Sequence, residues 1–341
     1  MRISKLAKEF VPYKVVENKY KIYLDKNENP FDFPAPLKEK IFEELKNVQF
    51  NRYPPITAEP LREKIAESLG LKMENIIVGN GSDEILSLVP KLTEGDYNII
   101  NSPTFVMYRF YSKHNGIKVM DIPLDEQFDL RTSEIKRYAD KARIIFICSP
   151  NNPTGNSLSR ERIIDILETG ACVVLDEAYI EFSDKESNID LLNHYDNLII
   201  LRTFSKAFSM AGIRVGYGIS NEKIISHLLA LKAPFTVNAL SMRIAEMMVE
   251  NRDVIEEKIK FIKSERKRLL RKLKNYAFPS DANFILVNLP VYHFLLERGI
   301  VVRHFGEERI KNMARITIGK KDENNTLLDA LKEYLNEMDS A

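Results

Sequence analysis

Lys206 occupies a position at which a lysine side chain can do chemistry. It follows the apolar run 198–201, which has the pattern of a buried strand, and a short polar turn. Burial at the end of a strand disfavours the ammonium form of lysine, so the free amine becomes available as a nucleophile. The alternative interpretation is a solvated lysine at the start of a surface helix, which is the commoner environment of lysine.

Anion-binding groups lie close to this lysine in the sequence. Thr203 and Ser205 precede it, and Arg214 follows it. Two hydroxyl groups and a guanidinium can hold a phosphate through charge-assisted hydrogen bonds. A nucleophilic amine beside a phosphate site predicts pyridoxal phosphate, bound to Lys206 as a Schiff base.

Three further apolar runs also end in polar clusters. Residues 76–78 precede Gly79-Asn-Gly-Ser-Asp83, residues 144–148 precede a loop that contains Asn152, and residues 173–175 precede Asp176-Glu-Ala-Tyr179. Ligands of open α/β sheets lie at the carboxyl ends of the strands, so we expect the clusters to converge.

Each cluster offers a distinct group to such a ligand. The glycine turn lets the backbone and the following helix start approach a phosphate. Asn152 could donate a hydrogen bond to a phenolic oxygen, and a partly buried Asp176 needs a cationic partner such as a pyridinium N–H. Taken singly, the glycine turn and the Asn152 loop also fit ordinary structural turns.

Length and composition indicate a folded chain and argue against nucleic acid, membrane and metal as partners. The chain has 341 residues, of which 44% are apolar, which predicts about two domains and a sizeable core. A net charge of +1 gives no field for nucleic acid, and no apolar run approaches the roughly 18 residues of a membrane span. The five histidines form no metal-ligand cluster, and Cys148 and Cys172 lie in apolar runs as core residues. Without a signal-peptide pattern, we expect a cytoplasmic protein that binds no metal, nucleic acid or membrane.

Strand and helix patterns divide the chain into three parts. Residues 1–30 have the pattern of an N-terminal arm, and residues 31–255 alternate strands and helices, which predicts an α/β domain with a largely parallel sheet. Residues 256–341 have the pattern of a smaller α+β domain. The expected boundary lies in a long helix near 250–275.

Seven motifs occur in the order that is typical of one family. With them the chain resembles the histidinol-phosphate aminotransferases, members of the fold-type I pyridoxal-phosphate enzymes. The resemblance covers the chain from about residue 12 to its last helix, and it implies a seven-stranded, largely parallel sheet in the large domain. The motifs are Asn27-Glu-Asn-Pro30, Asn51-Arg-Tyr-Pro54, Gly79-Asn-Gly-Ser-Asp-Glu84, Ser149-Pro-Asn-Asn-Pro-Thr-Gly155, Asp176-Glu-Ala-Tyr179, Thr203-Phe-Ser-Lys-Ala-Phe208 with Gly212-Ile-Arg214, and Arg315-Ile-Thr-Ile-Gly319.

The resemblance implies a cofactor-binding role for each matching residue. Lys206 would carry the cofactor and move a proton, Asp176 would pair with the pyridinium nitrogen, and Tyr179 with Asn152 would bond the ring oxygen. Phe105 would stack on the ring, where many relatives have tyrosine, so it keeps the flat face but lacks the hydroxyl. The phosphate would be surrounded by Gly81, Ser82, Asp83 (the last two through backbone N–H groups), Thr203, Ser205, Arg214 and, from the second subunit of a homodimer, Tyr53.

The resemblance also implies a substrate site. Arg315 and Arg303 would bind the phosphate of the substrate or the carboxylate of 2-oxoglutarate, next to Asn152. Tyr13 would close the site from the arm, and Glu28 lies in the loop expected near an imidazole. Alternatively, Arg303 is a surface residue and Tyr13 packs within the arm.

The implied reaction is a reversible ping-pong amino transfer in histidine biosynthesis (EC 2.6.1.9). L-Histidinol phosphate and 2-oxoglutarate would give imidazole-acetol phosphate and glutamate. Two alternatives share the fold, a threonine-phosphate decarboxylase and a broad aromatic or aspartate aminotransferase. A third is a cofactor-binding regulatory domain, which the full catalytic set and the lack of room for a DNA-binding module argue against.

Overall fold

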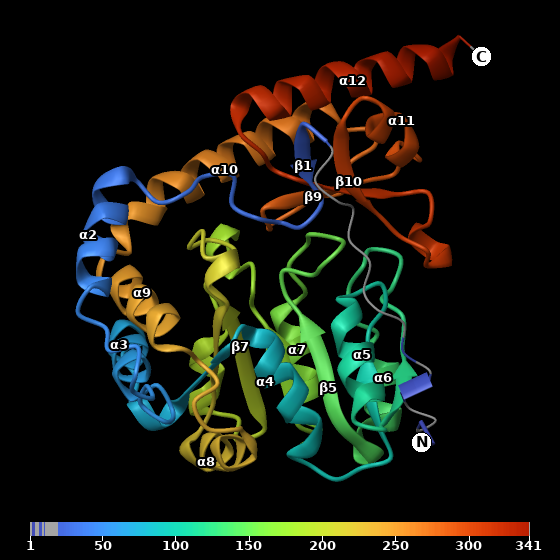
Figure 1. The fold of residues 1–341 in the computed structure, drawn as a ribbon. Helices are drawn as coiled ribbons and strands as arrows, with labels where there is room; N and C mark the ends of the chain where they lie inside the picture. The colour runs from blue at the N-terminus through green and yellow to red at the C-terminus, as the bar shows by residue number, and fades with distance from the viewer. Residues whose placement is uncertain (1, 4–6, 9, 11–19, 341) are drawn as a thin grey trace.

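A computed structural model describes residues 2, 3, 7, 8, 10 and 20–340 of the chain. Figure 1 shows a larger lower lobe and a smaller upper lobe, with the long helix α10 (Asp253–Lys272) running along the upper side. The larger lobe contains a sheet of seven strands, and the smaller lobe contains a sheet of four strands.

The seven-stranded sheet is parallel except at one strand. Its order is β2-β8-β7-β6-β5-β3-β4, and β8 runs antiparallel to both of its neighbours. This confirms the expected largely parallel sheet of seven strands. The strands are β2 (Ile76–Asn80), β3 (Tyr97–Ile100), β4 (Lys118–Asp121), β5 (Ala142–Cys148), β6 (Val173–Asp176), β7 (Leu198–Thr203) and β8 (Val215–Ile219).

Both faces of this sheet are buried, which explains why its central strands read as unbroken apolar runs. Along β5, Ile144, Phe146 and Cys148 enter one buried cluster, whereas Ile145 and Ile147 enter the other. Side chains alternate across a strand, so one apolar run supplies both clusters. The large lobe's helices are α2 (Ala35–Leu45), α3 (Glu59–Leu69), α4 (Ser82–Leu88), α5 (Val106–His114), α6 (Thr132–Tyr138), α7 (Arg160–Leu167), α8 (Glu222–Leu231) and α9 (Ala239–Glu250).

The four-stranded sheet joins the two ends of the chain. Its order is β1-β10-β11-β9, with β1 (Ile22–Leu24) parallel to β10 (Ile300–His304). The strand β1 falls in the segment expected to be an arm, and the proposed division at residue 255 falls within α10; the three-part division stays a prediction. The other elements here are β9 (Phe284–Val287), β11 (Ala314–Thr317), α11 (Tyr292–Glu297) and α12 (Lys321–Asp339).

Short 3-10 segments connect several of these elements. They are η1 (Met73–Asn75), η2 (Val89–Lys91), η3 (Ala139–Lys141), η4 (Ile180–Phe182), η5 (Ile189–Asn193), η6 (Ala211–Ile213) and η7 (Glu308–Ile310). Among the described residues, no helix combines the length and apolar character needed to cross a membrane. The same part of the chain contains no group of three or more His, Cys, Asp or Glu side chains placed to hold a metal ion.

Candidate active site

A polar cavity of about 610 Å³ lies at the carboxyl ends of three neighbouring strands of the large sheet. The last residues of β5, β6 and β7, which are Cys148, Asp176 and Thr203, all line it. The opposite wall comes from residues 25–28 and from the ends of β10 and β11. The polar clusters expected to converge therefore do so, at the edge of the sheet where ligands of α/β proteins bind.

Asp176 is a buried acid at the end of β6, with only 3% of its surface exposed. The Tyr108 hydroxyl donates to its Oδ2 at 2.7 Å, and the Ala178 N–H donates to its Oδ1 at 3.0 Å. Burial raises the pKa of Asp176 to about 6, and these two hydrogen bonds oppose the shift. A cation placed against this carboxylate would relieve the cost of its burial.

Lys206 is the amine of the cavity. Its Nζ donates to the carbonyl oxygen of Lys26 at 2.9 Å and lies 6.0 Å from the centre of the Tyr179 ring. The side chain is half-buried at the cavity wall. Burial, followed by the positive charge of Arg315, lowers the pKa of Lys206 to about 8. At pH 7 about a tenth of the Lys206 side chains would therefore be free amine, far more than for an ordinary lysine.

Tyr179 and Asn152 form a hydrogen-bonded chain with two other residues. The Tyr179 hydroxyl accepts from Asn27 Nδ2 at 3.0 Å and lies 3.4 Å from Asn152 Nδ2. Asn152 Oδ1 in turn accepts from Arg315 Nη1 at 2.6 Å. Asn27 lies in one of the seven motifs, but no role had been predicted for it. The backbone φ of Asn27 is 55°, a left-handed conformation that is uncommon for residues other than glycine.

The cationic end of the cavity is crowded around two glycines. Gly81 has a φ of 74°, and a Cβ there would lie 2.7 Å from Arg214 Nη2. A Cβ on Gly216 would lie 2.2 Å from the backbone nitrogen of Ser82. These positions require glycine because the backbone of β8 and the guanidinium approach the turn between β2 and α4 so closely.

The two candidate hydroxyls at this end have different surroundings. Ser205 Oγ lies 3.4 Å from Arg214 Nη1, whereas Thr203 Oγ1 accepts the backbone N–H of Ser205 at 3.0 Å. Arg214 also pairs with Asp83 at 3.2 Å. The Ser205 hydroxyl therefore faces Arg214, while Thr203 holds the turn that carries Ser205.

The two predicted substrate arginines lie on neighbouring strands of the small sheet. Arg303 on β10 stands directly opposite Arg315 on β11, and both line the cavity. Arg315 is buried and also donates to the carbonyl oxygen of Asp25. Glu28 lines the same cavity.

One predicted residue, Tyr53, does not line this cavity within a single chain. Tyr53 is 82% exposed and stacks on Phe235, with their ring centres 4.7 Å apart. Tyr13 lies outside the described residues. Tyr108 and Glu307, in contrast, lie near or in the cavity, and no sequence motif had drawn attention to them.

The groups present fit pyridoxal phosphate. A buried acid is available for the ring nitrogen, an amine for the aldehyde, and Tyr179 with Asn152 for the ring oxygen. Phe105 offers an aromatic wall, and the glycine-bounded end offers Arg214 and Ser205 to a phosphate. This donor set matches the chemistry of the cofactor at each polar position.

Comparison with known proteins agrees with this fit. Residues 19–331 match the family described as "Aminotransferase class I and II". Histidinol-phosphate aminotransferases of Pyrococcus furiosus and Thermococcus gammatolerans are 52% and 50% identical, over 96% and 97% of this chain and of theirs. The solved histidinol-phosphate aminotransferase of Clostridium acetobutylicum is 30% identical, with a TM-score of 0.84 over 93% of this chain and 100% of that one. The histidinol-phosphate aminotransferase of Sinorhizobium meliloti, solved with pyridoxal-5'-phosphate, covers 99% of this chain and 98% of its own, with a TM-score of 0.89. At 23% identity this match shows a similarity of fold.

The chain belongs to the class I and II aminotransferases, which are fold-type I enzymes. Within that family it is one of the histidinol-phosphate aminotransferases, so it is a transaminase that depends on pyridoxal phosphate. The family, fold and cofactor expected from the sequence are confirmed.

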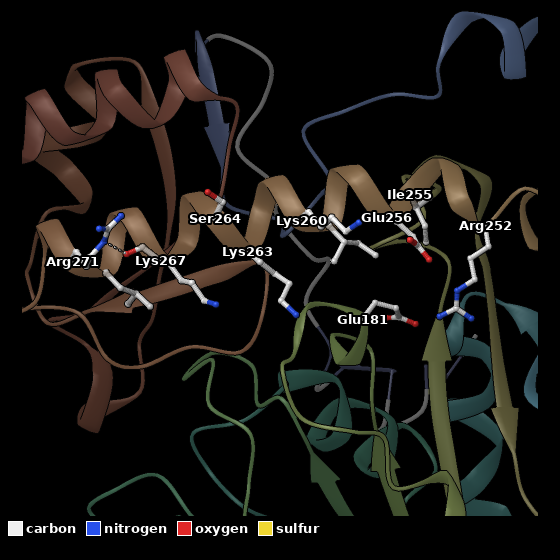
Figure 2. Close-up of a pocket in the computed structure, with 11 residues that line it drawn as sticks. Glu181, Arg252, Ile255, Glu256, Lys260, Lys263, Ser264, Lys267 and Arg271 are labelled. Carbon is white, nitrogen blue, oxygen red and sulfur yellow. Dashed lines mark hydrogen bonds between the residues drawn. The ribbon is translucent and has the colours of Figure 1, made fainter.

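A larger hollow, of about 880 Å³, runs along one face of α10 (Figure 2). Figure 2 shows Glu181 and Arg252 pointing towards one another beneath the helix. Lys263 and Lys267 both pair with Asp184, at 2.5 and 3.4 Å. Five cationic side chains and two carboxylates line this hollow, whereas Lys206 and Asp176 both lie in the smaller cavity.

Substitution of Gly216 by alanine tests the glycine-bounded end. The new methyl group would push the Ser82 backbone away, so we expect Gly216→Ala to weaken pyridoxal phosphate binding by at least about tenfold. Equilibrium dialysis of the apoprotein measures the dissociation constant. Gly212→Ala is the matched control, because nothing lies within 4 Å of its added Cβ. Equal affinities for the two variants would contradict the close approach.

The lowered pKa of Lys206 predicts the pH dependence of cofactor attachment. We expect the rate at which the apoprotein reacts with pyridoxal phosphate to rise with pH, with a midpoint near 8. The rate should rise because the unprotonated amine is the nucleophile. An ordinary lysine would give a midpoint of about 10.4. Stopped-flow absorbance follows the reaction. A midpoint at the ordinary value would show that burial does not free this amine.

Proposed function

We propose that this aminotransferase transfers the amino group of L-histidinol phosphate to 2-oxoglutarate in a reversible ping-pong reaction. The products are imidazole-acetol phosphate and glutamate, as in histidine biosynthesis. Support comes from relatives of that name that are 52% and 50% identical over nearly the whole chain. The observation in the structure that carries the proposal is the pair of arginines, Arg303 and Arg315, opposite one another in the cavity of Lys206.

Two cations suit a phosphate monoester better than one. Such an ester carries a charge of about −1.5 to −2 at pH 7 and offers three acceptor oxygens. Guanidinium groups bind phosphate and carboxylate through paired, charge-assisted hydrogen bonds. The same arginines would bind a carboxylate of 2-oxoglutarate in the second half of the reaction.

Residues of this chain would transfer the substrate's proton and hold the cofactor ring in place. Bound pyridoxal phosphate supplies the electron sink that stabilises negative charge at the substrate's α-carbon. Lys206 Nζ would take the proton from that carbon, since its pKa of about 8 suits a general base near neutral pH. Asp176 would hold a protonated ring nitrogen, and Tyr179 with Asn152 would orient the ring oxygen.

We assign the cofactor phosphate to the glycine-bounded end of the cavity. Arg214, the Ser205 hydroxyl and the first N–H groups of α4, at Ser82 and Asp83, would bind it, with Gly81 allowing the approach. Thr203 would act through the Ser205 turn. Phe105 would cover one face of the ring.

We infer a homodimer in which Tyr53 completes the partner's cofactor site. Support comes from large apolar side chains on the surface around it: Phe50 is 81%, Tyr53 82% and Ile56 50% exposed, and Phe235 stacks on Tyr53. Grouped exposed apolar side chains are typical of interaction surfaces. We also infer a cytoplasmic enzyme, in keeping with its two free, largely buried thiols, Cys148 and Cys172.

Substrate preference tests the proposed reaction. We expect kcat/KM for L-histidinol phosphate to exceed that for phenylalanine by at least about 100-fold, because phenylalanine offers Arg303 and Arg315 a singly charged carboxylate in place of the more highly charged phosphate. Steady-state assays with 2-oxoglutarate measure both constants. Lys206→Ala should abolish turnover, and Lys260→Ala, in the α10 hollow, is its control. A better constant with phenylalanine, or release of carbon dioxide from threonine phosphate, would contradict the proposal.

Mixing two defective variants tests the shared site. Lys206→Ala lacks the amine, and Tyr53→Ala lacks the hydroxyl that we assign to the other subunit. Random reassociation of subunits would restore about a quarter of the sites, since each mixed dimer contains one intact site. Activity of the mixture, compared with that of each variant alone, measures this gain. Sedimentation as a monomer, or full activity of Tyr53→Ala alone, would rule out the arrangement.

A further inference from the structure

Tyr108 is the side chain that the protein itself places against Asp176. Its hydroxyl donates to Asp176 Oδ2 at 2.7 Å, and the tyrosine is fully buried. The two residues are 68 positions apart in the sequence. Tyr108 lies on α5, behind Phe105, whereas Asp176 ends β6.

The ring of Tyr108 is held rigidly. It stacks on Phe146 with ring centres 5.0 Å apart and planes 4° apart, and it meets Phe105 edge-on at 5.5 Å. Phe146 lies on β5, whose pairing with β6 sets Phe146 opposite Val174. The sheet that fixes Asp176 thus also fixes the aromatic layer that aims the hydroxyl at it.

The other groups around Asp176 do not favour its charge. Asp83 on α4 and Glu177, next along the chain, are both acidic and raise its pKa, as burial does. The thiol of Cys148 on β5 and the hydroxyl of Tyr179 are neutral, because burial raises the pKa of each. Burial likewise raises the pKa of Tyr108 well above its usual value, so Tyr108 remains a proton donor at any working pH. Besides the Ala178 N–H, its hydroxyl is the donor that stabilises the carboxylate.

We propose that Tyr108 is a positioning residue for the cofactor: its hydroxyl keeps Asp176 ionised and oriented, so that the proton of this acid–pyridine pair resides on the ring nitrogen. The inference rests on the proposed role of Asp176 and not on which amine is the substrate. Without the hydroxyl, the carboxylate becomes more basic, and the shared proton moves from the ring nitrogen towards Asp176 Oδ2. A ring nitrogen without its proton is a weaker electron sink.

Tyr108→Phe removes the hydroxyl and keeps the aromatic packing. The holoenzyme is loaded with pyridoxal phosphate that carries ¹⁵N in the ring. In the wild type we expect the ¹⁵N chemical shift of a protonated ring nitrogen. In Tyr108→Phe we expect that chemical shift to move towards the value of an unprotonated ring nitrogen. We expect kcat for amino transfer to fall by about tenfold, the worth of one hydrogen bond to a charged group, with little change in KM. Tyr97→Phe is the matched control, since it deletes a hydroxyl on β3 of the same sheet that donates to the backbone carbonyl of Tyr138 on α6.

The apoprotein gives a second readout. The folded-state pKa of Asp176 is raised to about 6, so this group costs stability as pH rises from its unfolded value towards 6. Loss of the hydroxyl should extend that cost to higher pH. Urea unfolding should therefore show a destabilisation by Tyr108→Phe that grows between pH 5 and about 8, and does not grow in an Asp176→Asn background.

The two readouts decide between positioning and packing. An unshifted ¹⁵N resonance together with a destabilisation independent of pH would overturn the inference and leave Tyr108 a packing residue. That result would leave the proposed reaction intact, provided that the wild-type enzyme transaminates histidinol phosphate. Failure of the wild type to bind pyridoxal phosphate would instead remove the cofactor role of Asp176.

Discussion

The structure depends on keeping a carboxylate and an amine, Asp176 and Lys206, in one cavity that burial makes unfavourable for both charges. Burial pulls their pKa values towards one another, to about 6 and about 8. The fold bears this cost in the apoprotein, and a cofactor that is cationic at its ring nitrogen and reactive towards an amine relieves it. The same environment therefore favours such a cofactor and, in the function that we propose, prepares Asp176 and Lys206 to bind it.

The backbone that carries these groups is anchored by a second, deeper pair of charges. Glu177 follows Asp176, and Arg202 precedes Thr203, so one ion pair joins the ends of β6 and β7 just beneath the cavity. Arg202 Nη2 lies 3.0 Å from Glu177 Oε2, and both side chains are nearly inaccessible. Removal of one partner of such a buried pair leaves an unpaired charge in the core. The pair therefore links the ends of the two strands after which Tyr179 and Lys206 follow.

The small sheet closes the cavity with segments from opposite ends of the chain. Pairing of β1 with β10 carries residues 25–28 to the wall that also holds Arg303 and Arg315. Asn27 then reaches Tyr179, and the Asp25 carbonyl accepts from Arg315. Arg315 and Tyr179 are thus linked by hydrogen bonds through Asn152. A movement of the small sheet would therefore displace Asn27 and change its hydrogen bond to Tyr179.

The sequence by itself determined the local features. Apolar runs such as 144–148 predicted strands because strands buried on both faces need uninterrupted apolar side chains, and the polar clusters after them indicated where a ligand would bind. Only the tertiary structure decided the contacts between distant residues. The Tyr108–Asp176 and Asn27–Tyr179 bonds span 68 and 152 positions, and the Cβ-excluding approach of Gly216 to Ser82 depends on antiparallel pairing of β8 with β2. Periodicity tells which side chains share a face of one element, but it does not tell which element that face will meet.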